Sequence, residues 1–215
     1  MNYKQSLYHI AIAMYKINNL AYHNMQHVTQ AQKIATYLAT NEREYSIVTT
    51  SIVEMALLFH DTIYVPERND NEINSALMAR AILESLQSYQ SSFVIDTLAI
   101  DKICELIILT SRHCEALNES DLSTAAKLVM DADLHSLATF DYSQYIENAR
   151  KIRLENVHLD IATFCTRRKQ FLETMLNKPT LFYTDFAKKT MERQARANIE
   201  RELDDLDDNI FIYGN

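Results

Sequence analysis

Hydrophobic residues recur at every third or fourth position along almost the whole chain. On an α-helix this spacing gathers the apolar side chains on one face. The clearest runs predict helices near residues 7–17, 28–38 and 47–59. Further runs predict helices at 71–90, 93–112, 121–139, 141–158, 160–177 and 185–207. The pattern therefore predicts an all-α protein of about nine helices.

Short polar segments separate the apolar runs, as the connections of a helical bundle usually do. Examples are Asn18-Asn19, Val65-Pro66 and Asn177-Lys178-Pro179. The 215 residues include one glycine and two prolines, too few for the turns of a β-sandwich, a barrel or a glycine-loop nucleotide-binding fold. We expect a single compact bundle over residues 1–215, with a substantial core.

Charge and cysteine content restrict the class of partner and the compartment. The net charge is −8, and no run of Lys and Arg could follow a phosphate backbone, so duplex nucleic acid is excluded as the main partner. Cys104, Cys114 and Cys165 predict neither a disulfide framework nor a zinc ribbon. The apolar stretch 7–15 is too short and too polar for a signal peptide or a membrane span. We expect a cytoplasmic protein without a membrane partner.

Two histidines stand four residues apart, at His23 and His27. On a helix both would project from one face, a spacing that suits a metal or phosphate site. Taken alone, such a pair is more often a surface histidine beside a hydrogen-bonding residue at a helix start.

A stronger candidate is His60-Asp61, which ends the apolar run 55–59. A buried charge needs a partner or a metal ion. At a helix end, the carboxylate and the imidazole can both turn toward a cation. Asp131 and Asp133 similarly stand in an apolar stretch, but at i and i+2 they cannot share a helix face, and spacing does not choose between them. Several helices that each present His or Asp favour a metal site inside the bundle over separate buried ion pairs.

The order of His27, His60-Asp61 and a later aspartate at 131 or 133 resembles the H…HD…D signature of the HD superfamily of metal-dependent phosphohydrolases. Longer phrases, from about residue 20 to 205, resemble one bacterial subfamily of predicted HD phosphohydrolases. They are Tyr22-His23-Asn24-x-x-His27, Phe59-His60-Asp61-x-x-Tyr64, Asp70-Asn71-Glu72-x-x-Ser75-Ala76, Asp131-Ala132-Asp133-Leu134 and Ala195-Arg196-x-Asn198. The resemblance implies an HD-type bundle, with a metal-site core at 20–140 and C-terminal helices at 141–207 packed on it.

The resemblance also implies a divalent cation held by His27, His60, Asp61 and either Asp133 or Asp131. The match to the family phrase favours Asp133 as the ligand and implies that Asp131 supports the ligands without contacting the metal ion. Such a donor set suits Mn, Fe, Co, Ni or Zn better than Mg, and one or two ions would be compatible with it. The cation would activate water for attack on phosphorus, with Asp61 as a catalytic ligand.

Other residues of the matched regions have implied roles at the substrate. Glu72 would orient the attacking water or act as general base, unless it is an exposed acid at a helix start. His23 and His113 would contact phosphate or bind a second metal ion.

A phosphate ester also needs cationic side chains, which an acidic protein must supply locally. The candidates are Arg153, Arg196 and Arg68. Arg153 with Glu155, and Arg196 with Glu192, could instead form ordinary ion pairs.

We therefore expect a metal-dependent phosphohydrolase that cleaves a phosphate ester of a nucleotide or another small phosphorylated metabolite. Two alternatives stay open. One is a sensor module that binds a nucleotide or metal without turnover, and the other is an HD-type di-iron oxygenase. Glu155-x-x-His158 matches the di-iron unit of ferritin-like bundles, but such a site needs two copies and the chain has one.

Overall fold

The computed structural model describes residues 3–42, 46–89, 95–207 and 213. These residues form ten α-helices and contain no strand, which confirms the predicted all-α fold. The α-helices are α1 (Tyr3–Asn18), α2 (Met25–Ala39), α3 (Ile47–Phe59), α4 (Asn71–Tyr89), α5 (Thr97–Leu109), α6 (Thr124–Asp133), α7 (Tyr142–Glu155), α8 (Ile161–Leu176), α9 (Asp185–Thr190) and α10 (Glu192–Asp207). Three short 3₁₀-helices are η1 (Thr110–Arg112), η2 (Glu119–Asp121) and η3 (Leu134–Ala138).

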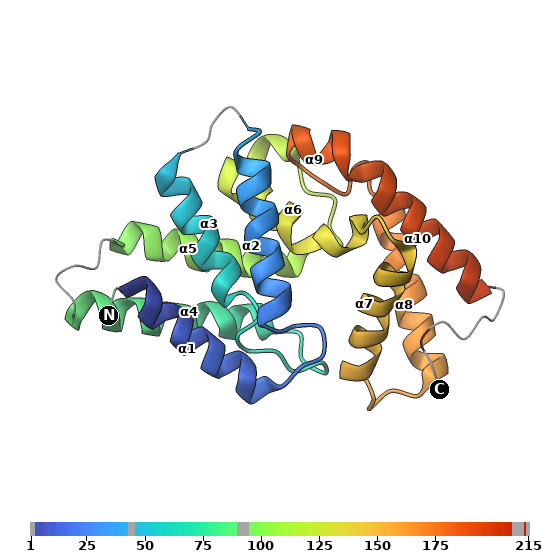
Figure 1. Cartoon of the computed structure of the whole chain (residues 1–215), viewed down its shortest axis with the longest axis horizontal. Helices are drawn as coiled ribbons and strands as arrows, with labels where there is room; N and C mark the ends of the chain where they lie inside the picture. The colour runs from blue at the N-terminus through green and yellow to red at the C-terminus, as the bar shows by residue number, and fades with distance from the viewer. Residues whose placement is uncertain (1–2, 43–45, 90–94, 208–212, 214–215) are drawn as a thin grey trace.

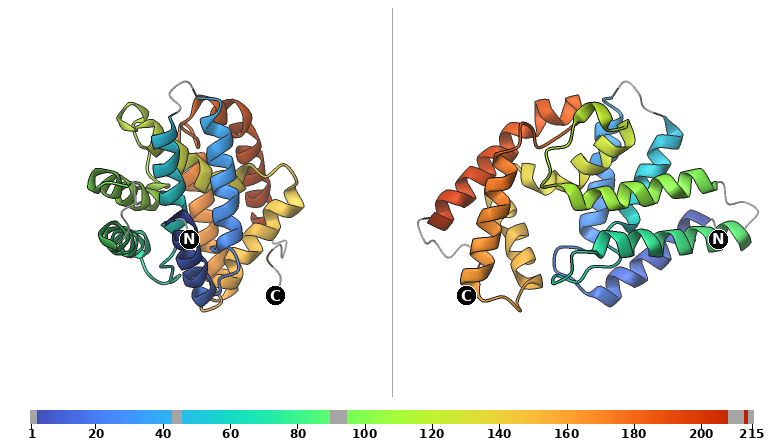
Figure 2. Two further views of the ribbon diagram at one scale, coloured as in Figure 1. Left: turned by 60° about the vertical axis from the view of Figure 1, so that its left-hand side comes forward. Right: turned by 180° about the vertical axis from the view of Figure 1, so that it is seen from behind.

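The helices α2, α3 and α6 pack on one another in the middle of the bundle (Figure 1). On one side, α4 and α5 lie side by side and α5 covers α3 (Figure 2). On the other side, α7, α8 and α10 form a second group, in which α10 contacts η3 and α8. None of the described helices combines the length and the apolarity that a membrane span requires.

Local hydrogen bonds fix the segments that carry the candidate residues. The Asn24 side chain begins α2 by accepting hydrogen bonds from the N–H groups of Gln26 and His27, at 2.8 and 3.4 Å. His27 therefore lies in the first turn of α2. His60 and Asp61 follow the last residue of α3, whose C-terminal residues 55–59 are fully buried.

The loop after Asp61 is held by two residues of α4. The Asn71 side chain forms a pair of 3.0 Å hydrogen bonds with the backbone of Val65. The Ser75 hydroxyl bonds the N–H and C=O of Ile63, at 3.0 and 3.1 Å. Asn71 and Ser75, two residues of the matched phrases, thus fix the loop beside the His60-Asp61 pair.

Three predicted helices are divided in the structure. The helix predicted at 93–112 ends at Leu109 and continues as η1. The helix predicted at 185–207 breaks at Met191, because Glu192 turns back to accept hydrogen bonds from the N–H groups of Leu181 and Phe182. The helix predicted at 121–139 ends at Asp133 and continues as η3. Tightening into a 3₁₀ turn is common at a helix end.

A buried ion pair joins α8 to α10. The Glu202 carboxylate, which has no exposed surface, accepts two hydrogen bonds from the Arg168 guanidinium, at 2.8 and 3.0 Å. It also accepts hydrogen bonds from the hydroxyls of Tyr145 and Tyr213. Burial raises the pKa of Glu202, but the charge and hydrogen bonds of Arg168 outweigh that effect and hold the pKa below its usual 4.5. The pair is therefore ionised at neutral pH.

We expect Glu202→Ala to lower the free energy of unfolding by about 3–5 kcal/mol, because it leaves the Arg168 charge buried without its partner. Urea denaturation at pH 7 measures this loss. The depressed pKa of Glu202 means that the folded state binds its proton more weakly than the unfolded state. Its stabilisation is therefore present above about pH 4.5 and is lost as the pH falls further.

The matched control is Asp207→Ala, which removes an ion pair with Lys169 on the same two helices, where the Asp207 side chain is 61% exposed. An exposed pair of this kind contributes about 0–1 kcal/mol. Equal losses in the two variants would contradict a special role for the buried pair.

Candidate metal centre

Three side chains from three helices meet where α2 begins and where α3 and α6 end. The Nε2 atoms of His27 and His60 are 3.3 Å apart. The Oδ1 atom of Asp133 lies 3.0 Å from the His27 nitrogen and 3.2 Å from the His60 nitrogen. The two histidines are buried and Asp133 is partly buried. One ion could contact all three atoms at once.

Asp61 adds a fourth donor to this cluster. Its Oδ2 atom lies 2.9 Å from Nε2 of His60 and 3.9 Å from Nε2 of His27. Despite this proximity the oxygen is buried and accepts no hydrogen bond with acceptable geometry. A buried carboxylate oxygen without a partner is unfavourable. The donor set of two imidazoles and two carboxylates therefore fits a divalent transition-metal ion, which would supply the missing contact.

The hydrogen bond of the other His60 nitrogen supports this interpretation. Nδ1 of His60 lies 2.9 Å from the Leu57 carbonyl oxygen and donates to it, so in the neutral imidazole, the form that binds a metal ion, the lone pair on Nε2 faces the cluster. Burial lowers the pKa of His60, but the carboxylates of Asp61 and Asp133 outweigh it and raise the pKa well above 6.5. The centre thus concentrates negative charge that a cation would neutralise.

The structure separates the two candidate aspartates of α6. Asp131 is fully buried and accepts hydrogen bonds from the N–H groups of Tyr183 and Thr184, at 2.7 and 2.8 Å, and from the Thr184 hydroxyl at 2.7 Å. All of these contacts fix the segment before α9. Asp133 alone of the two lies in the cluster with His27 and His60.

His113 and His23 lie beside the cluster. Nε2 of His113 is 2.8 Å from Oδ2 of Asp133, and Nδ1 of His113 is buried without a hydrogen-bond partner. The Lys178 ammonium donates to the His113 carbonyl at 2.6 Å and so fixes the backbone there. His23 stacks on the Tyr64 ring with 3.8 Å between the ring centroids.

Glu155, at the end of α7, holds the segment that contains His23. One carboxylate oxygen accepts hydrogen bonds from the N–H groups of Tyr22 and His23, and the other lies 2.6 Å from Nδ1 of His23. The alternative of a ferritin-like unit receives no support from this geometry, because Nδ1 of His158 instead lies 3.6 Å from the Glu67 carboxylate. The partner of Glu155 is thus His23, rather than the Arg153 or His158 that the sequence offered.

The three arginines predicted to meet phosphate are engaged elsewhere. Arg153 donates to the Asn156 carbonyl and packs over the ring of Phe164. Arg196 pairs with Glu192 and donates to the carbonyls at the end of α8. Arg68 forms an exposed ion pair with Asp70. None of these contacts brings a guanidinium to the cluster.

Glu72 is half-buried in the first turn of α4 and has no hydrogen-bond partner among the described residues. Burial and then the charges of Asp61, Glu155 and Glu72 raise the pKa of the Tyr64 phenol. No contact of the cluster involves Glu72.

Two further residues of the site were missed from the sequence. Arg168 stands in the run Arg167-Arg168-Lys169, which is typical of an exposed helix face, yet Phe164 and Leu172 at i−4 and i+4 are buried and indicate an inward direction. His135 stacks on His27 with 5.6 Å between centroids, and burial lowers its pKa to about 4.

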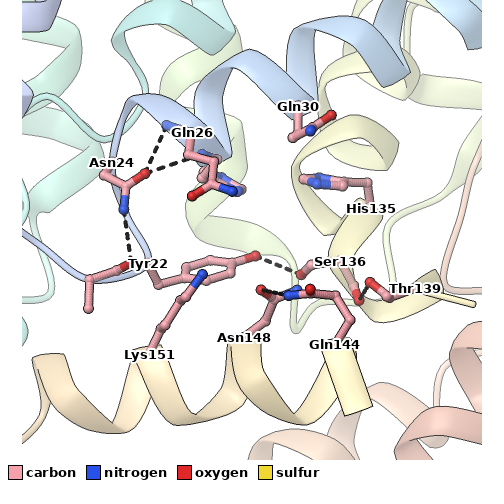
Figure 3. A pocket seen from close by; sticks show the side chains of 12 residues that line it. Tyr22, Asn24, Gln26, Gln30, His135, Ser136, Thr139, Gln144, Asn148 and Lys151 are labelled. Carbon is pink, nitrogen blue, oxygen red and sulfur yellow. Dashed lines mark hydrogen bonds between the residues drawn. The ribbon is translucent and has the colours of Figure 1, made fainter. Parts of the chain in front are cut away.

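Two cavities adjoin the cluster. The small cavity, about 170 Å³, is lined by His23, His113, Asp133 and Arg168. A larger one, about 330 Å³, has His27 in its wall and is shown in Figure 3. We call it the amide cavity, because its lining includes the side chains of Asn24, Gln26, Gln30, Gln144 and Asn148. The two cavities share Asn148, Tyr22 and Ser136, and the hydroxyl oxygens of Tyr22 and Ser136 are 2.6 Å apart.

Comparison with protein-family models, with curated proteins and with solved structures finds no match for this chain. Membership of the HD superfamily therefore stays a prediction from the motifs. The chemistry of the centre follows from the residues that meet there.

Proposed function

We propose that the chain is a metal-dependent phosphohydrolase that cleaves a phosphate ester of a small metabolite or nucleotide. The observation that carries the proposal is the convergence of four donors, from His27, His60, Asp61 and Asp133, one of which, Oδ2 of Asp61, is buried and accepts no hydrogen bond. A divalent cation bound there would polarise a phosphoryl oxygen and lower the pKa of a bound water toward neutrality.

The small cavity supports a phosphoryl group as the part of the substrate that reacts. It lies against Asp133 and is bordered by two histidines and the Arg168 guanidinium. Glu202 engages Nε and Nη2 of Arg168, and the remaining Nη1 has no partner among the described residues. In our proposal Nη1 donates to a phosphoryl oxygen, the role that we expected of Arg153, Arg196 or Arg68.

Glu155 positions His23 for the same substrate group. Nδ1 of His23 is engaged by the carboxylate, so Nε2 is the nitrogen left to donate to an ester or phosphoryl oxygen. Burial lowers the pKa of His23, but Asp61 and Glu155 together raise it above 6.5. A protonated imidazole here suits a substrate that carries negative charge.

Phosphate release from a panel of phosphorylated metabolites, nucleotides and phenyl phosphate tests the proposal. We expect release from at least one ester with added Mn, Co, Ni or Mg, complete loss with a chelator, and recovery when metal is restored. Release that persists in excess chelator, or no release from any ester with any of these ions, would contradict it.

A further inference from the structure

The amide cavity is polar and lacks acidic groups, which is unusual in this protein. The chain has 29 acidic residues, yet none of the twelve residues that line the cavity is Asp or Glu. They bring amide, hydroxyl and imidazole groups from the start of α2, from η3 and from α7 (Figure 3). A negatively charged ligand would therefore meet no repulsion from the cavity wall.

Lys151, on α7, is the one lysine or arginine among the lining residues. Its side chain is half-buried and points along the ring of Tyr22 (Figure 3). The ammonium group has no ion pair or hydrogen bond with any described residue, whereas Lys127, Lys169 and Lys188 each pair with a carboxylate. An unpaired ammonium in a wall without acids favours an anionic ligand.

Apart from Asn24, whose carboxamide caps α2 and bonds the backbone before it, the amides of this cavity are available to a ligand as well. The side chains of Gln26 and Gln30 form no hydrogen bond with the described residues, and Gln144 makes only a long 3.5 Å contact with Asn148. A carboxamide offers both donors and acceptors, so several of them together match the hydroxyl groups of a sugar or polyol. A volume of about 330 Å³ is at the lower end for small-molecule sites and fits such a ligand.

The position of the cavity links it to the metal centre. His27, whose Nε2 faces the cluster, also lines the amide cavity. Tyr22, Ser136 and Asn148 line both this cavity and the small one that borders Asp133. The two cavities are therefore neighbours with a common wall, and our proposal has one substrate reach from one to the other past the Tyr22–Ser136 pair.

We propose that the amide cavity recognises the hydroxyl-rich part of the substrate and that Lys151 pairs with a second anionic group on it. The preferred substrate class is then a phosphorylated sugar or polyol that carries a further phosphate or carboxylate. This inference rests on the proposed phosphohydrolase function, which places the reacting phosphoryl group in the small cavity.

The test compares wild type, Lys151→Gln and Gln30→Leu on fructose 1,6-bisphosphate, fructose 6-phosphate and phenyl phosphate. Lys151→Gln should raise KM for the bisphosphate about tenfold, because one charged hydrogen bond is lost. KM for fructose 6-phosphate and KM for phenyl phosphate should change less than twofold, because neither carries the second anionic group. Gln30→Leu should raise KM for both fructose esters and leave phenyl phosphate unchanged. The control Lys33→Gln alters an exposed lysine of α2 that lines a different cavity and should change nothing.

The outcomes separate this inference from the proposed function. If wild type hydrolyses phenyl phosphate but Lys151→Gln leaves KM for the bisphosphate within twofold, the inference is wrong and the phosphohydrolase stands. If no ester is hydrolysed, the phosphohydrolase proposal fails, and calorimetric titration of the bisphosphate then decides on the cavity alone. A Kd about tenfold weaker in Lys151→Gln would support the assigned anion site, and equal binding or none would overturn it.

Discussion

Asp133→Asn is expected to abolish metal binding and phosphate release, whereas Asp131→Asn should keep its metal. The Asp133 oxygen lies within 3.2 Å of both histidine nitrogens, so its replacement by an amide removes a negatively charged ligand from the cluster. Asp131 makes three hydrogen bonds to the segment before α9 and touches no candidate ligand. We expect Asp131→Asn to lower the melting temperature and to weaken metal binding at most tenfold, as a supporting residue would.

Metal content by mass spectrometry, together with thermal unfolding of both variants, measures these effects. The two substitutions are chemically identical and two residues apart, so each is the control for the other. Stoichiometric metal in Asp133→Asn, or its loss in Asp131→Asn alone, would reverse the assignment of the ligand.

Glu155→Gln is expected to lower kcat by about 10–100-fold while metal content stays unchanged. The carboxylate holds Nδ1 of His23 at 2.6 Å and raises the pKa of that imidazole. Without it, His23 loses its proton at lower pH, so the alkaline limb of the pH–rate profile should move to lower pH. This shift distinguishes a positioning residue from one that only maintains the fold.

Glu67→Gln is the matched control, because it makes the same change at another histidine–glutamate pair, 3.6 Å apart and with Glu67 exposed. It should leave kcat, the pH profile and metal content as in wild type. An unmoved alkaline limb in Glu155→Gln would argue against the role of His23 as a donor to substrate.

Helix periodicity predicted most of the fold from the sequence, because an apolar face has the same spacing wherever the helix packs. It could not predict the break at Met191, which depends on hydrogen bonds between Glu192 and the N–H groups of Leu181 and Phe182. Nor could it predict the change to 3₁₀ geometry after Asp133. Both features depend on tertiary contacts or local geometry rather than on the apolar repeat.

The same limit applies to the site. The apolar context of His60-Asp61 indicated a buried centre, and the order of the motifs indicated His27. Spacing did not choose between Asp131 and Asp133, and only the family phrase favoured Asp133; what Asp131 does instead depends on Thr184, more than fifty residues away along the chain. Arg196 was chosen from a family phrase and Arg68 from its place in the loop after Asp61, whereas the inward direction of Arg168 follows from its apolar neighbours at i−4 and i+4.

The metal content of the purified chain tests the central claim most directly. We predict at least about one divalent transition-metal ion per chain in wild type and less than a tenth of that content in Asp61→Ala. The variant should keep the helical circular dichroism signal and lose phosphate release. A wild-type chain that binds no metal even after reconstitution, or an Asp61→Ala variant with full metal and full release, would contradict the account.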